Sequence, residues 1–279
     1  LLMAMCFWMY SIAIALYPIH TNPVNMVAPL DLERGLRRSD GALLSPLPDF
    51  KIESGFITSA IIYEQYGMRL KVNGSAGFCG ATYVGSPENA IIESISKSII
   101  AWMCYRDTIH NSSVEHTYKL AGEMPIFDDV SWACSVCLQT LSQKTNFILF
   151  SSLGFDNEIG TEDSLKELVI QVIYNTVCGS NIWEIRNMTP SINCGQTPQE
   201  AKLAIGVSDA VVDMGLKRDQ IEDLVGDWMR ELHRKPVPEK KGISITDIYD
   251  LMINKPREEY RVKYENIKEE LVRRGLPLK

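Results

Sequence analysis

Two histidines near the middle of the sequence, His110 and His116, could take part in acid–base chemistry. They stand close to the carboxylates of Asp107 and Glu115. Imidazole changes its charge near neutral pH, so a histidine can donate or accept a proton, and it also binds metals. The spacing matches no established set of metal ligands. The two rings need not face each other, because His116 falls within a predicted strand and His110 before it. His20, at the end of the first apolar run, is a third candidate, because a barrel strand presents the residues at its end to a ligand.

A glycine-rich loop precedes the most clearly marked helix of the sequence. It carries Gly74, Gly77, Gly80 and Gly85, and glycine lets a backbone approach a ligand closely. The loop lacks the G-x-G-x-x-G pattern of dinucleotide-binding folds and the G-x-x-x-x-G-K-S/T pattern of phosphate-binding loops. The G-x-S-x-G turn of serine hydrolases is also missing from the sequence. These glycines are therefore candidates for contact with a cofactor, but a nucleotide is not favoured.

The seven cysteines are an odd number spread through apolar sequence, which is typical of reduced thiols in an intracellular protein. Cys134 and Cys137 form a C-x-x-C pair, but the pair lies inside an apolar helical run, without a second pair or a histidine beside it. A redox or zinc site needs a helix N-terminus or further ligands. We therefore expect both thiols to pack in the core, and we predict no metal site.

Composition and charge exclude several classes of protein. The 279 residues are 46% hydrophobic and 23% charged, as in a globular protein with a sizeable core. The formal net charge of −7, without any basic block, argues against nucleic acid and anionic membranes as partners. Residues 1–19 carry no charge, so they are either a membrane-spanning or anchor segment or a buried helix and strand. The buried alternative is favoured, because no positive residue precedes the segment.

Strands and helices alternate along the part of the chain that carries the candidate residues. Extended segments are predicted at Phe56–Tyr63 and Met68–Val72. After the glycine loop, a helix begins with Ser86 as N-cap and Pro87 in its first turn. Its apolar residues recur at helical spacing and predict a buried face. They are Ile91, Ile92, Ile95, Ile99, Ile100 and Trp102.

Further along, the same alternation predicts strands at Val114–Lys119 and Asn146–Ser151, and helices at Asp128–Gln143 and Glu162–Cys178, the latter ended by Gly179. From residue 197 onward the pattern is helical. A capping box at Thr197–Glu200 begins a helix to about Met214, a second helix covers Arg218–Arg234, and a third begins at Pro256 and ends at Gly275.

Strand–helix alternation with right-handed crossovers predicts a parallel barrel or a doubly wound sheet. We divide the chain into an α/β part at residues 1–196 and a helical C-terminal extension at residues 197–279, packed on the α/β part.

The last residues of the chain carry a distinctive series of motifs: Tyr249-Asp250, Pro256, Glu258-Glu259-Tyr260, Tyr264 and Gly275-Leu276. In this series the sequence resembles the archaeal monomethylamine:corrinoid protein methyltransferases. The loop Gly77–Glu88 resembles the glycine loop and acidic helix start of that family, and His116 and Trp132-Ala133-Cys134 fall at compatible separations. The resemblance covers roughly residues 50–279, and the C-terminal series is its most specific part.

The resemblance implies a TIM barrel that moves a methyl group from methylamine to the Co(I) of a corrinoid on a partner protein. It further implies a cytoplasmic protein of methanogenesis, and we expect a homo-oligomer. Family members are longer at the N-terminus, so we expect this chain to be a fragment with a partial barrel.

The chain departs from the family pattern at two positions. The pyrrolysine of the family, which captures the amine, would fall near Leu16 to Pro18, where no residue can form such an adduct. The acidic residue that supports it would fall near Asn73, an amide that can hydrogen-bond a ligand but cannot act as a base near neutral pH. We therefore expect the fold to be shared, but the methylamine chemistry to differ.

Three hypotheses follow for the function. The first is methyl transfer from a methylated or quaternary amine to a corrinoid, where attack needs positioning more than an electrophilic trap. Aromatic rings would hold the cation in that case, and Tyr63, Tyr66, Phe78 and Tyr83 are the candidates, with ordinary core packing as the alternative. The second is a non-catalytic paralogue that binds corrinoid or a corrinoid protein without turnover. The third is a soluble domain anchored in a membrane by residues 1–19.

Overall fold

A computed structural model describes residues 41–44, 54–65, 69–73, 76–78, 86–104, 109–111, 114–116, 127–155, 157–187, 196–234 and 243–278. Within these residues, five strands form one parallel sheet in the order β1-β2-β4-β6-β7. The strands are β1 (Gly41–Leu44), β2 (Arg69–Asn73), β4 (Ile109–Asn111), β6 (Leu149–Phe155) and β7 (Asn181–Asn187). A second, two-stranded parallel sheet joins β3 (Ala76–Phe78) to β5 (Val114–His116).

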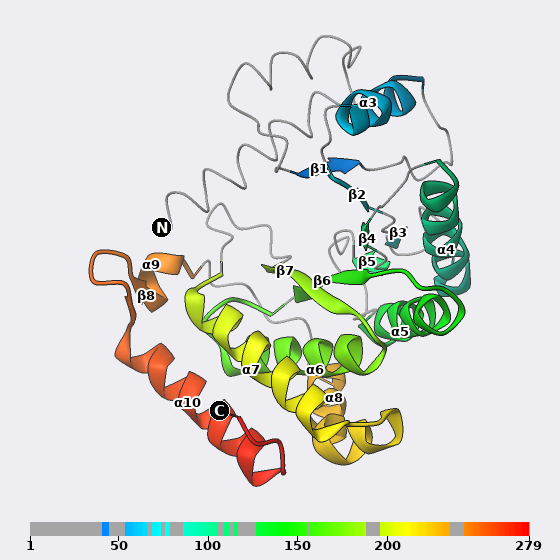
Figure 1. The fold of residues 1–279 in the computed structure, drawn as a ribbon. Helices are drawn as coiled ribbons and strands as arrows, with labels where there is room; N and C mark the ends of the chain where they lie inside the picture. The colour runs from blue at the N-terminus through cyan, green and yellow to red at the C-terminus, as the bar shows by residue number, and fades with distance from the viewer. Residues whose placement is uncertain are drawn as a thin grey trace.

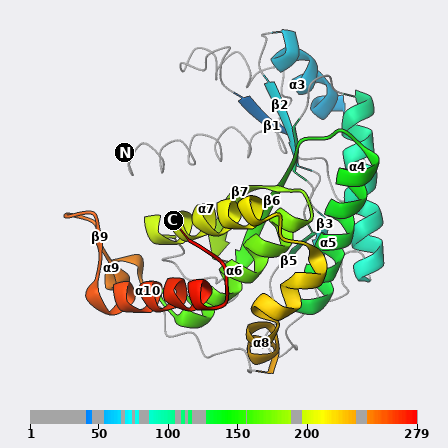
Figure 2. The same ribbon diagram turned by 60° about the horizontal axis from the view of Figure 1, so that its bottom comes forward.

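In the main sheet, each strand lies beside the next one along the chain, and a helix connects each pair. The connecting helices are α3 (Ser54–Gln65), α4 (Pro87–Cys104), α5 (Phe127–Lys144) and α6 (Glu162–Val177). All of them lie on the same side of the strands (Figure 1, Figure 2). Sequential strand order with helices on one side is the arrangement of a β/α barrel wall, whereas a doubly wound sheet carries helices on both faces. The described strands form an arc and not a closed barrel.

The C-terminal third consists mainly of helices that pack around α6. It contains α7 (Pro198–Met214), the short 3-10 turn η3 (Arg218–Gln220), α8 (Ile221–Arg234), α9 (Ile245–Ile248) and α10 (Glu258–Arg273), with a small antiparallel hairpin of β8 (Tyr249–Asp250) and β9 (Lys255–Pro256) before α10. Helices α7, α8 and α10 all contact α6. Among the described helices, none is both long and apolar enough to cross a bilayer.

Local capping signals predicted several helix ends correctly, although Pro256, expected to begin the last helix, lies in β9 and α10 begins at Glu258. The Ser86 hydroxyl accepts a hydrogen bond from the Asn89 N–H at 3.3 Å, as expected of an N-cap. Thr197 and Glu200 form the predicted capping box of α7. Gly179 and Gly215, with φ of +86° and +60°, end α6 and α7. Such left-handed backbone is accessible to glycine without strain, which is why glycine marks these ends.

Some strand predictions were wrong or missing. The run Phe56–Tyr63, predicted to be extended, belongs to helix α3. A continuous apolar run fits a buried strand or a buried helix equally well, and its periodicity does not separate them. Of the strands in the two parallel sheets, β1, β3, β4 and β7 were not predicted, and β4 is only three residues long. Strand β6 begins and ends later than the predicted segment Asn146–Ser151.

Helix α4 exposes part of the face that was predicted to be buried. Ile91 is buried as expected, but Ile92 and Ile99 are exposed, and Trp102 is 63% exposed. The buried side instead carries an ion pair between Glu93 and Lys97, with 2.5 Å between the carboxylate and ammonium groups, together with Ser94 and Ser98, which are also buried. The apolar residues recur at helical spacing, as predicted, but only part of the side that they mark faces the core.

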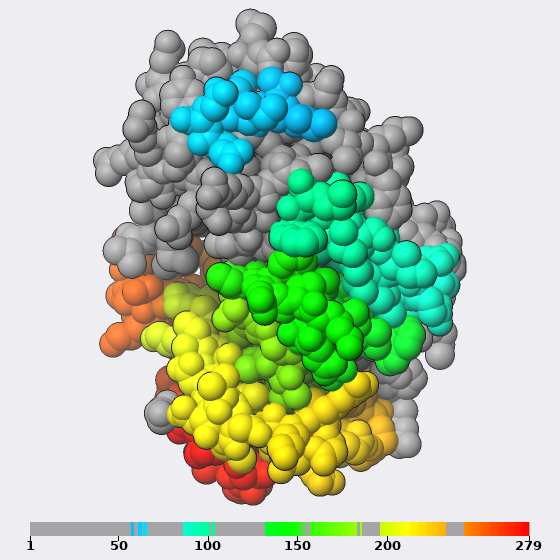
Figure 3. Space-filling model, turned by 45° about the vertical axis from the view of Figure 1, so that its right-hand side comes forward, coloured from blue at the N-terminus to red at the C-terminus, as the bar shows by residue number. Residues whose placement is uncertain are grey.

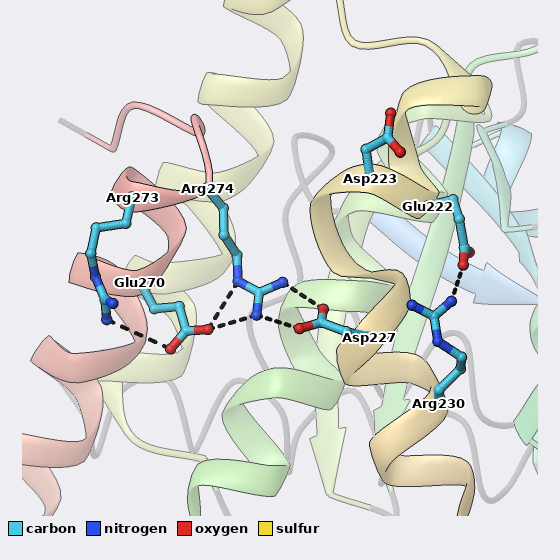
Figure 4. A pocket seen from close by; sticks show the side chains of 7 residues that line it. All are labelled: Glu222, Asp223, Asp227, Arg230, Glu270, Arg273 and Arg274. Atoms are coloured by element: carbon cyan, nitrogen blue, oxygen red, sulfur yellow. Dashed lines mark hydrogen bonds and ion pairs between the residues drawn. The ribbon is translucent and has the colours of Figure 1, made fainter.

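A cluster of charges attaches α10 to α8 (Figure 4). The Arg274 guanidinium contacts both carboxylate oxygens of Asp227, at 2.5 and 2.7 Å, and the Glu270 carboxylate at 2.6 Å. It also donates to the Leu224 carbonyl and lies 4.5 Å from the centre of the Trp228 ring. The hydrogen bonds from Arg274 lower the pKa of Asp227 to about 2. The cluster therefore joins two helices through one planar guanidinium.

We expect Arg274→Gln to lower the free energy of unfolding by about 1 kcal/mol, since Asp227 is partly exposed and water screens the pair. Because the pKa of Asp227 is depressed from its ordinary value of 3.8, this stabilisation is complete above that value and is lost as the pH falls through about 2. Urea unfolding of both forms near neutral pH and in acid measures the change and its pH dependence.

Arg261→Gln is the matched control, because Arg261 pairs with Glu258 on the exposed surface of the same helix. Such a pair within one helix contributes only about 0.2–0.5 kcal/mol. Equal losses for both variants would show that Arg274 does not join the helices.

Candidate functional site

The carboxyl ends of strands β2 and β4 meet at one edge of the sheet. Asn73 ends β2 and Asn111 ends β4, and their Cα atoms are partners in the ladder. In parallel α/β folds, ligands bind at the carboxyl ends of the strands. The two asparagines therefore occupy neighbouring positions at the edge where a site is expected.

Past this edge, strands β3 and β5 pair with each other. Their paired residues are separated by the same number of residues along the chain as the paired residues of β2 and β4. Gly77 is the partner of Glu115, and Phe78 is the partner of His116. Three residues predicted from the sequence, Gly77, Phe78 and His116, thus lie on two adjacent short strands just past Asn73. Together these positions offer an imidazole, a carboxylate and an amide, which can move a proton and hydrogen-bond a small polar ligand.

Asn111 was not predicted from the sequence, although a signal was present. Asn73 is followed by Gly74-Ser75 and a strand, and Asn111 is followed by Ser112-Ser113 and a strand. The same order of asparagine, two small residues and a strand occurs at the ends of two neighbouring strands. Strand pairing makes these positions neighbours.

Other predicted residues are not brought together with these. Tyr63 lies near the end of α3, the helix that leads into the start of β2, and so at the opposite edge from Asn73. His110 lies within β4, with Val72 and Leu149 as its strand partners. The remaining candidates lie outside the described residues: His20, Tyr66, Gly74, Gly80, Tyr83 and Gly85.

The loop after β6, at the same carboxyl edge, is held by the C-terminal segment. The buried Glu158 accepts a hydrogen bond from the Ile243 N–H at 2.6 Å, and Lys263 donates to the Gly160 carbonyl at 3.2 Å. Gly160 has a φ of +78°, and a Cβ there would lie 2.5 Å from Cγ2 of Ile248. The segment from residue 243 to 263 therefore fixes one of the loops at the edge of the candidate site.

A buried carboxylate also stands at the first turn of α7, the helix after β7. Glu200 accepts hydrogen bonds from the Thr197 backbone N–H at 2.7 Å and from the Thr197 hydroxyl. Burial raises the pKa of Glu200, and the hydroxyls of Thr197 and Tyr260 oppose that shift. Burial and the nearby Glu200 raise the pKa of Tyr260. Tyr260, in the first turn of α10, and Glu200, in the first turn of α7, are both buried.

The C-x-x-C pair packs in the core, as predicted. Cys134 and Cys137 are buried free thiols, as is Cys178. The Cys137 thiol lies 3.4 Å from the Ser94 hydroxyl of α4, and burial raises its pKa to about 12. A thiol with such a pKa is almost never a thiolate near neutral pH, and so it is a poor nucleophile and metal ligand. No group of histidines, cysteines and carboxylates suited to a metal ion occurs in the described part of the chain.

We expect Gly160→Ala to destabilise the fold by about 2–3 kcal/mol, because the new methyl group overlaps Ile248 and left-handed backbone is strained for alanine. Gly215→Ala is the matched control: Gly215 also has a positive φ, of +60°, but no atom lies within 4 Å of the place that a Cβ would take, so only about 1 kcal/mol of backbone strain is expected. Urea unfolding compares them. Equal losses would show that the loop does not depend on its contact with α9.

We also expect Cys134, Cys137 and Cys178 to resist alkylation in the folded chain at mildly alkaline pH. Their thiols are buried, and the raised pKa of Cys137 leaves only about one thiolate in ten thousand at pH ~8. Peptide mass spectrometry after iodoacetamide treatment, in buffer and in urea, measures the protection. Rapid labelling of these three residues in buffer would contradict the burial of their thiols.

Both the sequence and the fold match one known family of proteins. The sequence profile of the family "Monomethylamine methyltransferase MtmB" matches residues 20–276. No curated protein matches the chain. Two solved structures share its fold, each with a TM-score of 0.71 and 18% sequence identity over 88% of this chain. One is the Methanosarcina barkeri monomethylamine methyltransferase (MtmB), and the other is a hydroxylamine MtmB complex.

The chain spans about half the length of these solved relatives, covering 52% of each. At this identity the structural match establishes a shared fold, and the profile match over most of the sequence establishes the family. The resemblance found in the C-terminal motifs is thereby confirmed. The chain belongs to the MtmB monomethylamine methyltransferase family.

Proposed function

We propose that this chain transfers a methyl group from a methylated amine to the corrinoid of a partner protein. Family membership supports the reaction class. The observation that carries the proposal is the strand register at the carboxyl edge, where Asn73 neighbours Asn111 and Phe78 neighbours His116. A small amine would bind at this edge, and the corrinoid protein would approach from the same side as the methyl acceptor.

Each residue in this proposal has a role that its chemistry allows. His116 would exchange a proton with the substrate or leaving amine, since imidazole titrates near neutral pH. Asn73 and Asn111 would hydrogen-bond the ligand as amides, which neither give up nor take up a proton near pH 7. Phe78, and Tyr83 further along the chain, would contact an alkylammonium ion through their rings.

A non-catalytic paralogue is the second candidate. The observation that favours it is the pair of amides at the ends of β2 and β4, because neither Asn73 nor Asn111 can capture an amine or act as a general base. Such a chain would bind a corrinoid, or a corrinoid protein, without turnover.

The direct test mixes the full chain with Co(I)-cobalamin and follows methyl-Co(III) formation by absorbance. The donors are mono-, di- and trimethylamine and a quaternary amine. Methylation by any donor supports the transferase, and the donor identifies the substrate class. Cobalamin binding without methylation, in folded protein, would replace the transferase by the non-catalytic paralogue.

With an active donor, we expect His116→Gln to lower the methylation rate by about 10²-fold or more, because it removes a proton-transfer group. The pH dependence between about pH 5 and pH 8 should flatten as well, since the titrating group is gone. His233→Gln is the matched control, because His233 lies on α8 in the C-terminal third, and its rate should be unchanged. An unaltered rate and pH profile for His116→Gln would remove His116 from the site.

A further inference from the structure

The turn between β8 and β9 presents three large apolar side chains to solvent. Leu251 and Ile253 are 48% and 63% exposed, and Met252 is 94% exposed. Figure 3 shows this segment, in orange, at the left-hand edge of the molecule. A single exposed apolar residue is ordinary, but three in succession at the tip of a hairpin mark a surface that contacts another molecule.

Hydrogen bonds hold this turn in one shape. The Asp250 carboxylate accepts from the N–H groups of Met252 and Ile253, at 2.9 and 3.2 Å. The Tyr249 hydroxyl donates to the Asn254 carbonyl at 2.9 Å. Asn254 has a φ of +54°, a left-handed conformation that asparagine tolerates better than most residues. The apolar side chains are therefore held outward on a preorganised support.

The foot of the hairpin is joined to the carboxyl edge of the main sheet. Ile248, directly before β8, packs against Gly160 in the loop after β6. The Arg257 N–H, directly after β9, donates to the Ile248 carbonyl at 2.8 Å. Leu251 is three residues beyond Ile248, so the turn begins within about 11 Å of that contact. The apolar tip therefore stands close to the edge that carries the candidate site.

The same hairpin carries positive charge. Lys255 and Arg257 are both exposed, and in the part of the chain that the structure describes no carboxylate pairs with either of them. The neighbouring Glu258 and Glu259, by contrast, are paired within α10. A chain with a net charge of −7 is therefore locally basic beside the apolar tip. This surface fits a partner with an apolar depression bordered by carboxylates.

We propose that the hairpin tip, residues 251–253, is a docking contact for the corrinoid-carrying protein. The inference rests on the proposed function, because methyl transfer brings the cobalt to the amine at the carboxyl edge and the partner must then cover the surface beside it. A projecting tip cannot enclose a small ligand, which needs a concave site, but it can enter a depression on another protein. A few apolar side chains held at the centre of an interface carry most of its affinity.

Two methyl acceptors separate docking from chemistry. Free Co(I)-cobalamin needs no protein docking, whereas a corrinoid protein of the kind that monomethylamine methyltransferases methylate does. For Met252→Ser/Ile253→Ser we expect the KM for the corrinoid protein to rise by about tenfold to a hundredfold at unchanged kcat. The rate with free cobalamin should stay the same. Val212→Ser/Val272→Ser is the matched control, since both valines are exposed on α7 and α10, and it should keep wild-type values with both acceptors.

Asp250→Ala tests the rigidity of the turn. It keeps the three apolar side chains but removes the acceptor of two backbone hydrogen bonds. We expect the KM for the corrinoid protein to rise by about threefold to tenfold, because the turn then has to be ordered on binding. An unchanged KM would show that the shape of the turn does not matter to docking.

Lys255→Glu tests the charge. Its KM for the corrinoid protein should rise at low salt and approach the wild-type value as salt is added, because ions screen exposed charges. A KM that equals the wild-type value at every salt concentration would remove Lys255 from the interface.

An unchanged KM for Met252→Ser/Ile253→Ser, with normal transfer to free cobalamin, would overturn the docking contact and leave the proposed transferase intact. If the wild type methylates neither acceptor, the transferase fails, and sedimentation of the chain with the corrinoid protein decides the docking contact. A complex that this variant loses supports it. No complex, or a complex that the variant keeps, overturns it. A variant that unfolds at lower urea than the control would show that the chain itself covers the tip, which also overturns the proposal.

Discussion

Helix α6 is surrounded on every side, because none of its residues from 163 to 177 is exposed. Leu168, Val169, Ile170 and Ile173 are all completely buried, whereas an outer helix of a barrel wall normally keeps one polar face toward water. Burying each such side chain stabilises the fold by about 1.5–3 kcal/mol. The sheet covers one side, and α7, α8 and α10 cover the others. The C-terminal helices are therefore part of the core that holds β6 and β7 in place, and through Glu158 and Gly160 they also fix a loop at the carboxyl edge.

The sequence predicted best what is decided locally. Helix ends at Ser86, Thr197 and Gly215 depend on hydrogen bonds and backbone angles within one turn, so a few residues suffice to identify them. Strands in a buried parallel sheet lack such signals: β4 is short, and the run at residues 56–63 is mostly apolar, so helix α3 was mistaken for a strand. For α4 the period was correct, but a helical period does not say which side meets the core when both sides carry isoleucine.

The candidate site was predictable in part, for a related reason. His116, Phe78 and Gly77 were chosen for their chemistry, and the strand register made them neighbours. Asn111 became relevant only through its pairing with Asn73, a contact between distant parts of the chain. By contrast, Tyr63 was chosen as an aromatic residue near the loop in sequence, but the helix that carries it leads to the other edge of the sheet. Tyr63 and Asn73 are close in sequence, but strand β2 runs between them from one edge of the sheet to the other.

The buried ion pair and the exposed isoleucines of α4 both result from the side that this helix turns toward the core. Removing Glu93 and Lys97 from water costs free energy that their attraction offsets only with good geometry, and leaving Ile92, Ile99 and Trp102 in water forgoes about 25 cal/mol per Å² of apolar area. Hydrophobic burial alone therefore does not explain which side of α4 faces the core.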